Sequence, residues 1–153
     1  MVLAAKVLAL AAPDLKPPSS VRETGDEPRF VRADAGRIGE VAVQQALIER
    51  DAVDPGSVAV IVPDSLVEVV ATAFDRAGVD VGRAARNGLN LQITLVPVSL
   101  VKGLELDATV VVEPAAILAE EVQGARSLYV ALTRATKRLV VVHEAPLPEV
   151  LCP

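Results

Sequence analysis

Residues 58–78 read VAVIVPDSLVEVVATAFDRAG, and they contain the clearest pattern of secondary structure in the chain. The VAVIV run at 58–62 is short and continuously apolar, which is typical of a strand buried on both faces of a sheet. Asp64 and Ser65 are residue types that cap helices, and Gly78 is the residue type that most often ends them. The stretch therefore predicts a strand, a turn and a helix through Ala77, which is the repeating unit of an α/β protein.

The same alternation of strands and helices continues on both sides of this unit. Apolar residues with helical spacing at 36–52, closed by Asp54, Pro55 and Gly56, predict a helix there. Another helix is predicted from about 119 to 137, and a turn at 87–90. Further strands are predicted at 29–33, 91–98, 110–113 and 138–143. Such alternation indicates an α/β fold with a mainly parallel sheet that helices cover on both faces.

The composition of the 153 residues suits one domain whose core is built from small aliphatic side chains. Apolar residues make up 52% of the chain, but aromatic residues only 2%, and Trp is absent. Residues 1–12 predict a helix ended by Pro13, and the chain enters this helix without a cap, which suggests a fragment of a longer protein. A proline-rich connection at 13–28 and an irregular tail at 144–153 complete the single domain predicted for 1–153.

The charge and the cysteine content argue against several classes of protein. The net charge of −5 and the pI near 4.9 lack the basic excess of a free-standing nucleic-acid binder. The acidic balance favours a protein or nucleotide partner over a membrane surface, and residues 1–12 are too short to span a bilayer. Cys152 has no partner for an internal disulfide and makes no metal site with His143. We therefore predict a cytoplasmic protein without a bound metal or a membrane partner.

The segment VPVSLVKGLELD at 96–107 is the first candidate for chemistry. A strand ends there, and in doubly wound sheets ligands collect in the loops at the carboxyl ends of strands. Gly103 would allow the backbone to approach a phosphate closely, and Glu105 could accept hydrogen bonds from ribose hydroxyls. The alternative is that Lys102 and Glu105 are an ordinary solvated pair in a surface loop, and the spacing of these residues leaves both interpretations open.

The helix predicted to end at 137 contains the second candidate. Ala125, Leu128, Leu132 and Ala135 fall on one stripe, which should face the sheet, and Arg134 lies off this stripe on a face of small residues. A planar, permanently charged guanidinium suits contact with a γ-phosphate that a facing domain presents. The alternative is a solvated arginine near a helix C-terminus, where the helix dipole favours a cation.

Two motifs in order carry a resemblance to a known family. KGLELD at 102–107, followed by LYVALTRA at 128–135 and a valine-rich strand, resembles motifs V and VI of superfamily 1 helicases of the UvrD type. The usual forms are KGLEFD and YVALTRA, so Leu106 replaces a phenylalanine. Tyr129 and Thr133 of the second motif are expected to position the helix, the first by packing and the second by local hydrogen bonds. The resemblance covers 91–143 and extends more loosely to the whole chain, which implies a RecA-like three-layer α/β/α domain.

The resemblance implies roles for individual residues of both motifs. Gly103 matches the motif V glycine near the γ-phosphate, and Glu105 matches the glutamate that holds the nucleotide ribose. Lys102 precedes them in the same motif and joins the expected nucleotide-binding group. Arg134 matches the arginine finger of motif VI, whose guanidinium stabilises charge as the γ-phosphate leaves. Arg134 is therefore the predicted catalytic residue.

The sequence departs from this family in two ways. DNA-translocating members generally have Thr and His just before motif V, where this chain has Pro97 and Ser99, and this argues against direct nucleic-acid contact there. The form VPVSLVKGLE instead looks like the HelD branch, whose members bind RNA polymerase. The sequence also contains no GxxxxGKS/T phosphate loop. The resemblance therefore implies a site for ATP with Mg²⁺ that is shared with an N-terminal RecA-like domain outside this chain.

The resulting expectation is the C-terminal motor domain of an ATP-dependent DNA helicase-like ATPase, active in the longer protein. The chain alone is expected to be monomeric, to bind no cofactor and to be inactive, because it has no phosphate loop. In the longer protein the expected partners are the N-terminal RecA-like domain and nucleic acid, RNA polymerase or both. The alternative, from a different class, is a non-catalytic interaction domain that keeps the helicase fold, for example one that binds RNA polymerase.

Overall fold

The computed structural model describes residues 28–83, 92–101, 106–120 and 122–148. Within these ranges the strands are β1 (Arg29–Arg32), β2 (Val58–Val62), β3 (Gly82–Arg83), β4 (Ile93–Pro97), β5 (Leu106–Val112) and β6 (Ala135–His143). The helices are α2 (Ile38–Val53), α3 (Val67–Ala77), α4 (Pro114–Glu120) and α5 (Gly124–Leu132), with short 3-10 turns η1 (Asp64–Leu66) and η2 (Val98–Leu100). The helix predicted at 1–12, nearly all of the connection at 13–28 and the turn at 87–90 lie outside the described residues.

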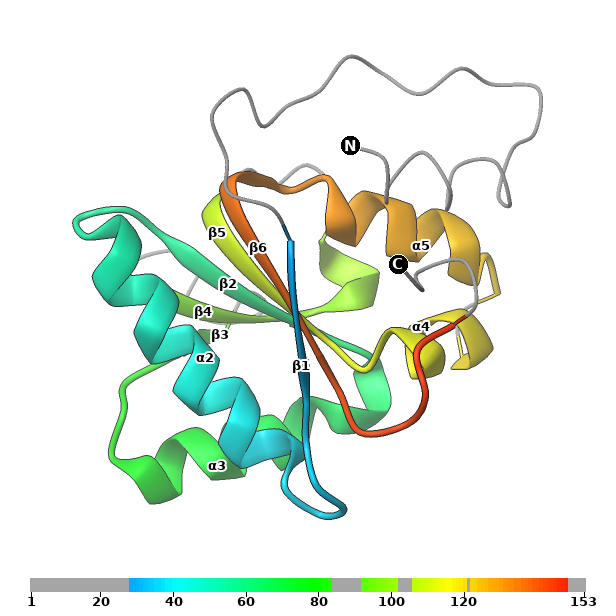
Figure 1. Ribbon diagram of the computed structural model, residues 1–153, viewed down its shortest axis with the longest axis horizontal. Coiled ribbons are helices and arrows are strands. Elements are labelled where there is room, and N and C mark those ends of the chain that lie inside the picture. The colour runs from blue at the N-terminus through cyan, green and yellow to red at the C-terminus, as the bar shows by residue number, and fades with distance from the viewer. Residues whose placement is uncertain (1–27, 84–91, 102–105, 121, 149–153) are drawn as a thin grey trace.

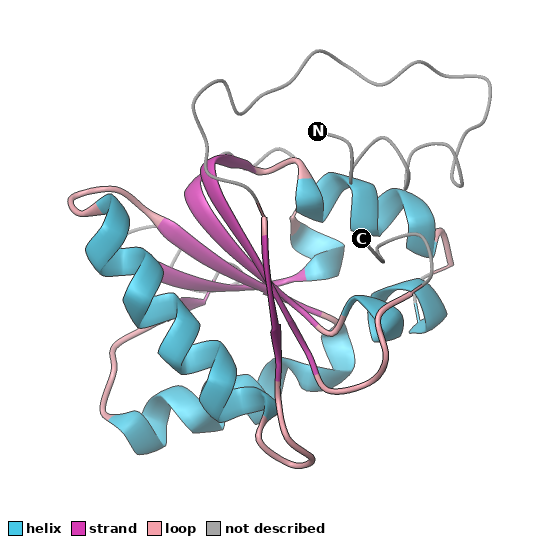
Figure 2. Ribbon diagram, viewed as in Figure 1, coloured by secondary structure: helices cyan, strands magenta, loops and turns pink. Residues whose placement is uncertain are grey.

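The described strands form one sheet in the order β1-β6-β5-β2-β4-β3, and every neighbouring pair is parallel (Figures 1 and 2). A connection between parallel strands must cross the sheet to return to the starting edge, which places helices on the faces. α2 and α3 pack on one face, and α4 and α5 pack on the other (Figure 1). The predicted three-layer α/β/α fold with a parallel sheet is confirmed.

Each inner strand contributes to two separate cores because successive side chains point to opposite faces of the sheet. In β2, Val58, Val60 and Val62 join the core beneath α2 and α3, whereas Ala59 and Ile61 join the core beneath α4 and α5. All five side chains are fully buried. The continuous apolar run at 58–62 is thus explained by burial on both faces, and the strand has the predicted bounds.

The helix after β2 ends as predicted but begins differently. Gly78 follows α3 in the left-handed conformation, with φ of 69°, which a residue without a Cβ adopts easily. The prediction that Asp64 and Ser65 cap this helix is wrong, because they lie in η1 and no side chain caps α3. Their side chains are engaged across the sheet edge, where the Asp64 carboxylate accepts from the Ser99 hydroxyl (3.2 Å) and the Ser65 hydroxyl donates to Glu120 (2.7 Å).

The single helix predicted at 119–137 is also wrong, since the segment contains two helices and the start of a strand. α4 ends at Glu120 and α5 begins at Gly124, where a Cβ atom would collide with the backbone of Leu118. That close approach requires a glycine and a break between the helices. α5 ends at Leu132, and β6 begins at Ala135 because the backbone there already pairs with β5.

Several strand and helix bounds differ from the prediction by a few residues. β1 and α2 agree with the predictions at 29–33 and 36–52 to within two residues. The strand predicted at 110–113 begins earlier, at Leu106, since its first residues pair with the extended start of β6. The strand predicted at 91–98 ends at Pro97, because Val98 enters η2. Residues 144–148 of the tail contain neither helix nor strand.

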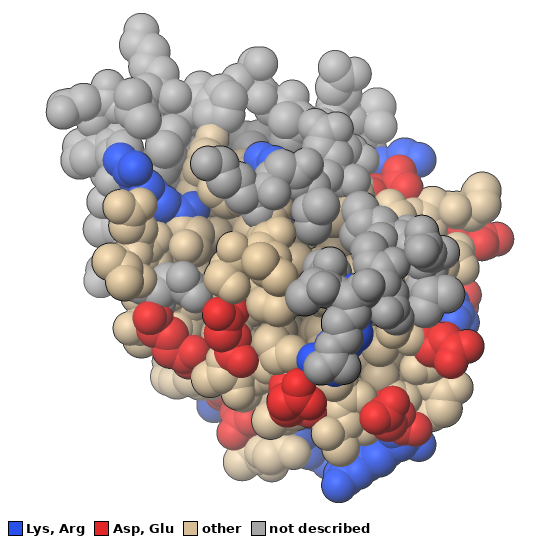
Figure 3. Space-filling view, turned by 180° about the vertical axis from the view of Figure 1, so that it is seen from behind, with Lys and Arg blue, Asp and Glu red and all other residues tan. Residues whose placement is uncertain are grey.

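The charged groups on the described surface are mixed in sign. On the face seen in Figure 3, the described Lys and Arg side chains lie apart from one another and are interrupted by Asp and Glu, without a continuous basic stripe. In the described ranges, none of the helices combines the length and the apolar character that crossing a bilayer requires. Nor do three or more His, Cys, Asp or Glu side chains gather there in an arrangement that could hold a metal ion.

A buried carboxylate joins the edge of the sheet to α2. Glu49 on α2 is completely buried, and its two oxygens accept from Arg29 of β1 (2.8 Å) and Arg138 of β6 (2.6 Å). Arg29 also donates to Gln45, one turn earlier on the same helix (2.9 Å). A buried charge is tolerated only when it is paired and hydrogen-bonded, so this cluster fixes α2 against the β1–β6 edge.

We expect Glu49→Gln to lower the free energy of unfolding by about 2–3 kcal/mol, because an amide replaces the charge that holds two arginines. Both arginines are partly exposed and can be hydrated, which keeps the loss below that of a fully buried pair. Urea unfolding followed by circular dichroism measures the change. Glu40→Gln is the matched control, since Glu40 lies on the same helix in an exposed pair with Arg37, and it should change stability by less than about 0.5 kcal/mol. Equal effects of the two substitutions would contradict this role of Glu49.

Candidate functional site

The segment that resembles motif V leads to the amino edge of the sheet. β4 and β5 are parallel, so the chain must cross from the carboxyl end of β4 at Pro97 to the amino end of β5 at Leu106. KGLELD was expected at the carboxyl ends of the strands. For its last two residues, Leu106 and Asp107, this expectation is wrong, because they form the amino end of β5. Lys102, Gly103 and Glu105, the predicted nucleotide-binding residues, lie outside the described residues.

The two motifs meet at this edge through the backbone. The Leu106 N–H donates to the Arg134 carbonyl (3.1 Å), and Leu106 pairs with Ala135 in the β5–β6 ladder. The predicted catalytic residue thus lies directly beside the last residues of KGLELD. The parallel pairing of β5 with β6 brings together segments that are far apart in the sequence (Figure 1).

Arg134 occupies the turn between α5 and β6, which corrects the prediction that it lies within a helix that continues to 137. Its Nε donates to the Val130 carbonyl (3.2 Å), and its Nη2 donates to the Thr133 hydroxyl (3.2 Å). The guanidinium therefore folds back onto the C-terminal turn of α5, where the carbonyl ends of the helix favour a cation. The half-buried Arg134 therefore lies at the C-terminal end of α5, beside the last residues of KGLELD.

Tyr129 and Thr133 position this turn in the way the sequence predicted. The Thr133 hydroxyl donates to the Tyr129 and Val130 carbonyls (3.0 Å each). Carbonyl groups in the last turn of a helix lack partners within the helix, and this contact supplies one. The half-buried Tyr129 packs against the core beneath α4 and α5. Burial raises the pKa of Tyr129, although the nearby positive charge of Arg134 acts in the opposite direction.

Asp107 is a further residue of this edge, and no role for it was predicted from the sequence. Its Oδ2 accepts from the Ser57 N–H (2.8 Å), just before β2, and its Oδ1 pairs with Lys137 of β6 (3.4 Å). The hydrogen bond from Ser57, followed by the charge of Lys137, lowers the pKa of Asp107 below its usual value. The available signal was a charged residue at the start of an otherwise apolar strand, which needs a partner when it is partly buried. Strand alternation gave no guide, because the pairing shifts register between Leu106 and Ala108.

We expect Asp107→Asn to lower the free energy of unfolding at pH 7 by about 1 kcal/mol, because the amide cannot form a charged pair with Lys137. A group whose pKa is lowered by folding stabilises the protein above its unfolded pKa. That stability is lost as the pH falls through the folded pKa. The difference between wild type and variant should therefore shrink below the ordinary value of 3.8. Urea titrations between pH 7 and pH 3 test this, with the exposed Asp51→Asn as control; a difference independent of pH would refute it.

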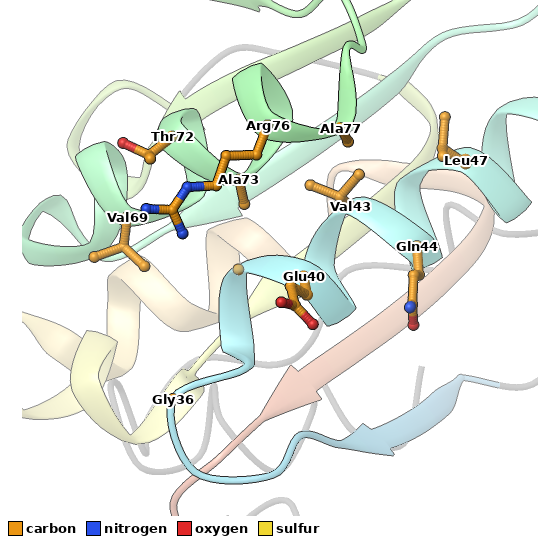
Figure 4. Close-up of a pocket in the computed structure, with 11 residues that line it drawn as sticks. Gly36, Glu40, Val43, Gln44, Leu47, Val69, Thr72, Ala73, Arg76 and Ala77 are labelled. Atoms are coloured by element: carbon orange, nitrogen blue, oxygen red, sulfur yellow. The ribbon is translucent and has the colours of Figure 1, made fainter.

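A separate hollow of about 410 Å³ lies between α2 and α3 (Figure 4). Its walls are mainly apolar and include Val43, Val69 and Ala73, with Arg76 extending along one side. The two helices approach closely at Gly39, where a Cβ would lie 3.0 Å from that of Ala73. Arg134, the predicted catalytic residue, does not line this hollow. The hollow is therefore separate from the amino edge of the sheet where Arg134 lies.

Comparison with known proteins gives both a sequence match and structural matches. Residues 92–142 match the sequence model of the UvrD-like helicase C-terminal domain. No curated protein sequence matches the chain. The C-terminal domain of a possible DNA helicase from Lactobacillus plantarum is similar in structure, with a TM-score of 0.74 and 21% identity, over 99% of this chain and 89% of that one.

Two larger proteins share the fold over part of their length. The SWI2/SNF2 ATPase core of Sulfolobus solfataricus, solved with double-stranded DNA, has a TM-score of 0.59 and 11% identity over 77% of this chain and 28% of that one. The Arterivirus nonstructural protein 10 helicase, solved with DNA, has a TM-score of 0.50 and 18% identity over 96% of this chain and 34% of that one. The chain therefore has the RecA-like fold of a helicase C-terminal domain, and its residues 92–142 are similar in sequence to the UvrD-like form of that domain.

Proposed function

We propose that this chain is the C-terminal motor domain of a HelD/UvrD-type ATP-dependent helicase-like ATPase. In this proposal it supplies motif V and the arginine finger of motif VI to an ATP site that an N-terminal RecA-like domain completes. The observation that carries the proposal is the hydrogen bond from the Leu106 N–H to the Arg134 carbonyl, which joins the two motifs at one edge of the sheet. The match of residues 92–142 to the UvrD-like C-terminal domain supports it.

The residues at this edge fit an anionic nucleotide. Arg134 holds a permanent positive charge there, and its hydrogen bonds to Val130 and Thr133 restrict where the guanidinium can lie. A pre-positioned cation stabilises the negative charge that develops on a transferring phosphoryl group without first having to reorganise. Lys102, Gly103 and Glu105 would hold the phosphate and ribose of ATP, and Mg²⁺ would neutralise phosphate charge when the nucleotide is bound.

The chain would contribute only one wall of this site. Its sequence lacks the phosphate loop that cradles the β- and γ-phosphates, so a second domain must provide it. Binding of nucleotide between two domains favours their closed arrangement, and hydrolysis releases it. We infer that this cycle acts on nucleic acid, RNA polymerase or both, in the cytoplasm.

The region before motif V favours RNA polymerase over direct contact with a nucleic-acid strand. The Ser99 hydroxyl is already engaged with the carboxylate of Asp64 (3.2 Å), and Pro97 has no N–H to donate. A carboxylate at this position repels a phosphate backbone. The same observation supports the second candidate function, a non-catalytic domain that binds a protein partner through the helicase fold.

In the longer protein, we expect Arg134→Ala to reduce ATP turnover by about a thousandfold or more, since it removes the charge that stabilises the transferring phosphoryl group. Arg134→Lys should be nearly as inactive, because an ammonium cannot reproduce the planar contacts. Nucleotide binding, measured with a fluorescent ATP analogue, should change only a few-fold. Arg126→Ala, which removes an exposed arginine of α5, is the matched control and should remain active. The isolated chain gives the zero-turnover baseline, and near-normal turnover of Arg134→Ala would overturn the proposal.

The partner is tested by the ATPase rate of the longer protein with single-stranded DNA, with RNA polymerase core enzyme and with neither. We expect the polymerase to change the steady-state rate several-fold and single-stranded DNA to have the smaller effect, since the acidic Asp64 lies beside Ser99. Stimulation by DNA alone would establish a nucleic-acid motor instead. Absence of ATP hydrolysis under all three conditions would favour the non-catalytic domain.

A further inference from the structure

Glu113 has a strained backbone and lies at the carboxyl edge of the sheet, where β5 ends and opposite the edge that holds Arg134. Glu113 follows Val112 directly and has φ of 50°, the left-handed region that residues with a side chain rarely adopt. Its N–H donates to the Val142 carbonyl (2.7 Å), which holds it at the carboxyl end of the β5–β6 pair. Strained backbone of this kind persists where the surrounding structure forces it, and such positions gather at binding sites.

The carboxylate of Glu113 is buried and only half satisfied. The residue is 8% exposed, and its Oε2 accepts from the N–H groups of Glu144 (3.0 Å) and Ala145 (3.3 Å). Its Oε1 is buried without a hydrogen-bond partner among the described residues. An unpaired buried carboxylate oxygen is costly, so a site that leaves one open is prepared to receive a hydrogen-bond donor.

Glu113 lines a hollow of about 570 Å³. The hollow lies where the connections that follow two neighbouring strands lead to opposite faces of the sheet. β2 and β5 are neighbours, but β2 leads to α3 on one face of the sheet and β5 leads to α4 on the other. In open α/β sheets this divergence creates a crevice outside the carboxyl ends of the strands, which is where ligands bind. The Ser65–Glu120 hydrogen bond (2.7 Å) links the two sides of the crevice.

The lining of this hollow has a definite chemistry. Three carboxylates contribute to it, those of Glu113, Glu120 and Glu144, and its described lining contains no Lys or Arg. Small side chains of α4, among them Ala116 and Ala119, form the apolar part. A ligand that fits must therefore combine an aliphatic stem with a cationic, hydrogen-bond-donating end.

We propose that this crevice receives an arginine side chain of a protein partner. The aliphatic part of the arginine lies against the alanines of α4, and its guanidinium pairs with the carboxylate of Glu113. A guanidinium is the side-chain group that pairs best with a buried carboxylate, because it carries several donors in one plane and keeps its charge out of water. The site lies at the edge of the sheet opposite Arg134, so it is separate from the proposed ATP site.

The test uses N-acetyl-arginine-N-methylamide as the probe, followed by ¹H–¹⁵N NMR of this chain. We expect saturable shifts of the Glu144 and Ala145 amides, which donate to Glu113, and of the nearby Ala116 amide. N-acetyl-norleucine-N-methylamide, which has a similar stem without charge, should cause no comparable shifts. Glu113→Gln should weaken the apparent affinity at least about tenfold, because a charged hydrogen bond is lost. The exposed Asp51→Asn is the control and should bind the probe like the wild type.

Ala119→Leu provides an independent variant at an exposed helix position, in case Glu113→Gln fails to fold. It fills the hollow while leaving the Glu113 carboxylate in place, and it should weaken probe binding to a similar extent. The proposal is overturned if the wild type shows no saturable shift, if norleucine amide binds equally well, or if the folded variants bind the arginine probe like the wild type.

Discussion

The parallel pairing of β5 with β6 is the constraint on which the rest of the structure depends. It begins at the amino edge, where Leu106 pairs with Ala135, and ends at the carboxyl edge, where the Glu113 N–H meets the Val142 carbonyl. Because the pair is parallel, the chain must leave β5 at one edge and return to β6 at the other. α4 and α5 make that return and thereby place Arg134 beside the end of the KGLELD segment.

The same geometry gives the two edges of the sheet different chemistry. The amino edge holds Arg134 and Lys137, the latter paired with Asp107, whereas the described carboxyl edge carries Asp64, Glu113 and other acids. The proposed ATP-binding wall and the proposed arginine-binding crevice therefore lie at opposite edges of the sheet. The buried Glu49 is held by Arg29 of β1 and Arg138 of β6, so it fixes α2 against these two neighbouring strands.

Local sequence patterns predicted the buried inner strands well, but they predicted several helix boundaries poorly. The VAVIV strand and the end of α3 at Gly78 followed from residue type, because burial on both faces and a left-handed helix end each require particular side chains. Helical spacing at 119–137 was misleading, since it registers apolar residues but not the contact at Gly124 or the pairing of Ala135 with β5. The first is a contact with Leu118, six residues away, and the second joins residues far apart in the sequence; both override local helical preference.

The sequence by itself determined the α/β class, the valine-rich inner strands and the ordered motifs that name Arg134 as the residue to test. Only the tertiary structure decided that Arg134 sits in a turn, folded onto the end of α5 and bonded through its carbonyl to Leu106. Only the tertiary structure showed that Glu113 has a strained backbone and that its buried Oε1 has no hydrogen-bond partner among the described residues. The physical reason is that periodicity records which face of an element is buried, whereas strand order and register decide which distant residues meet.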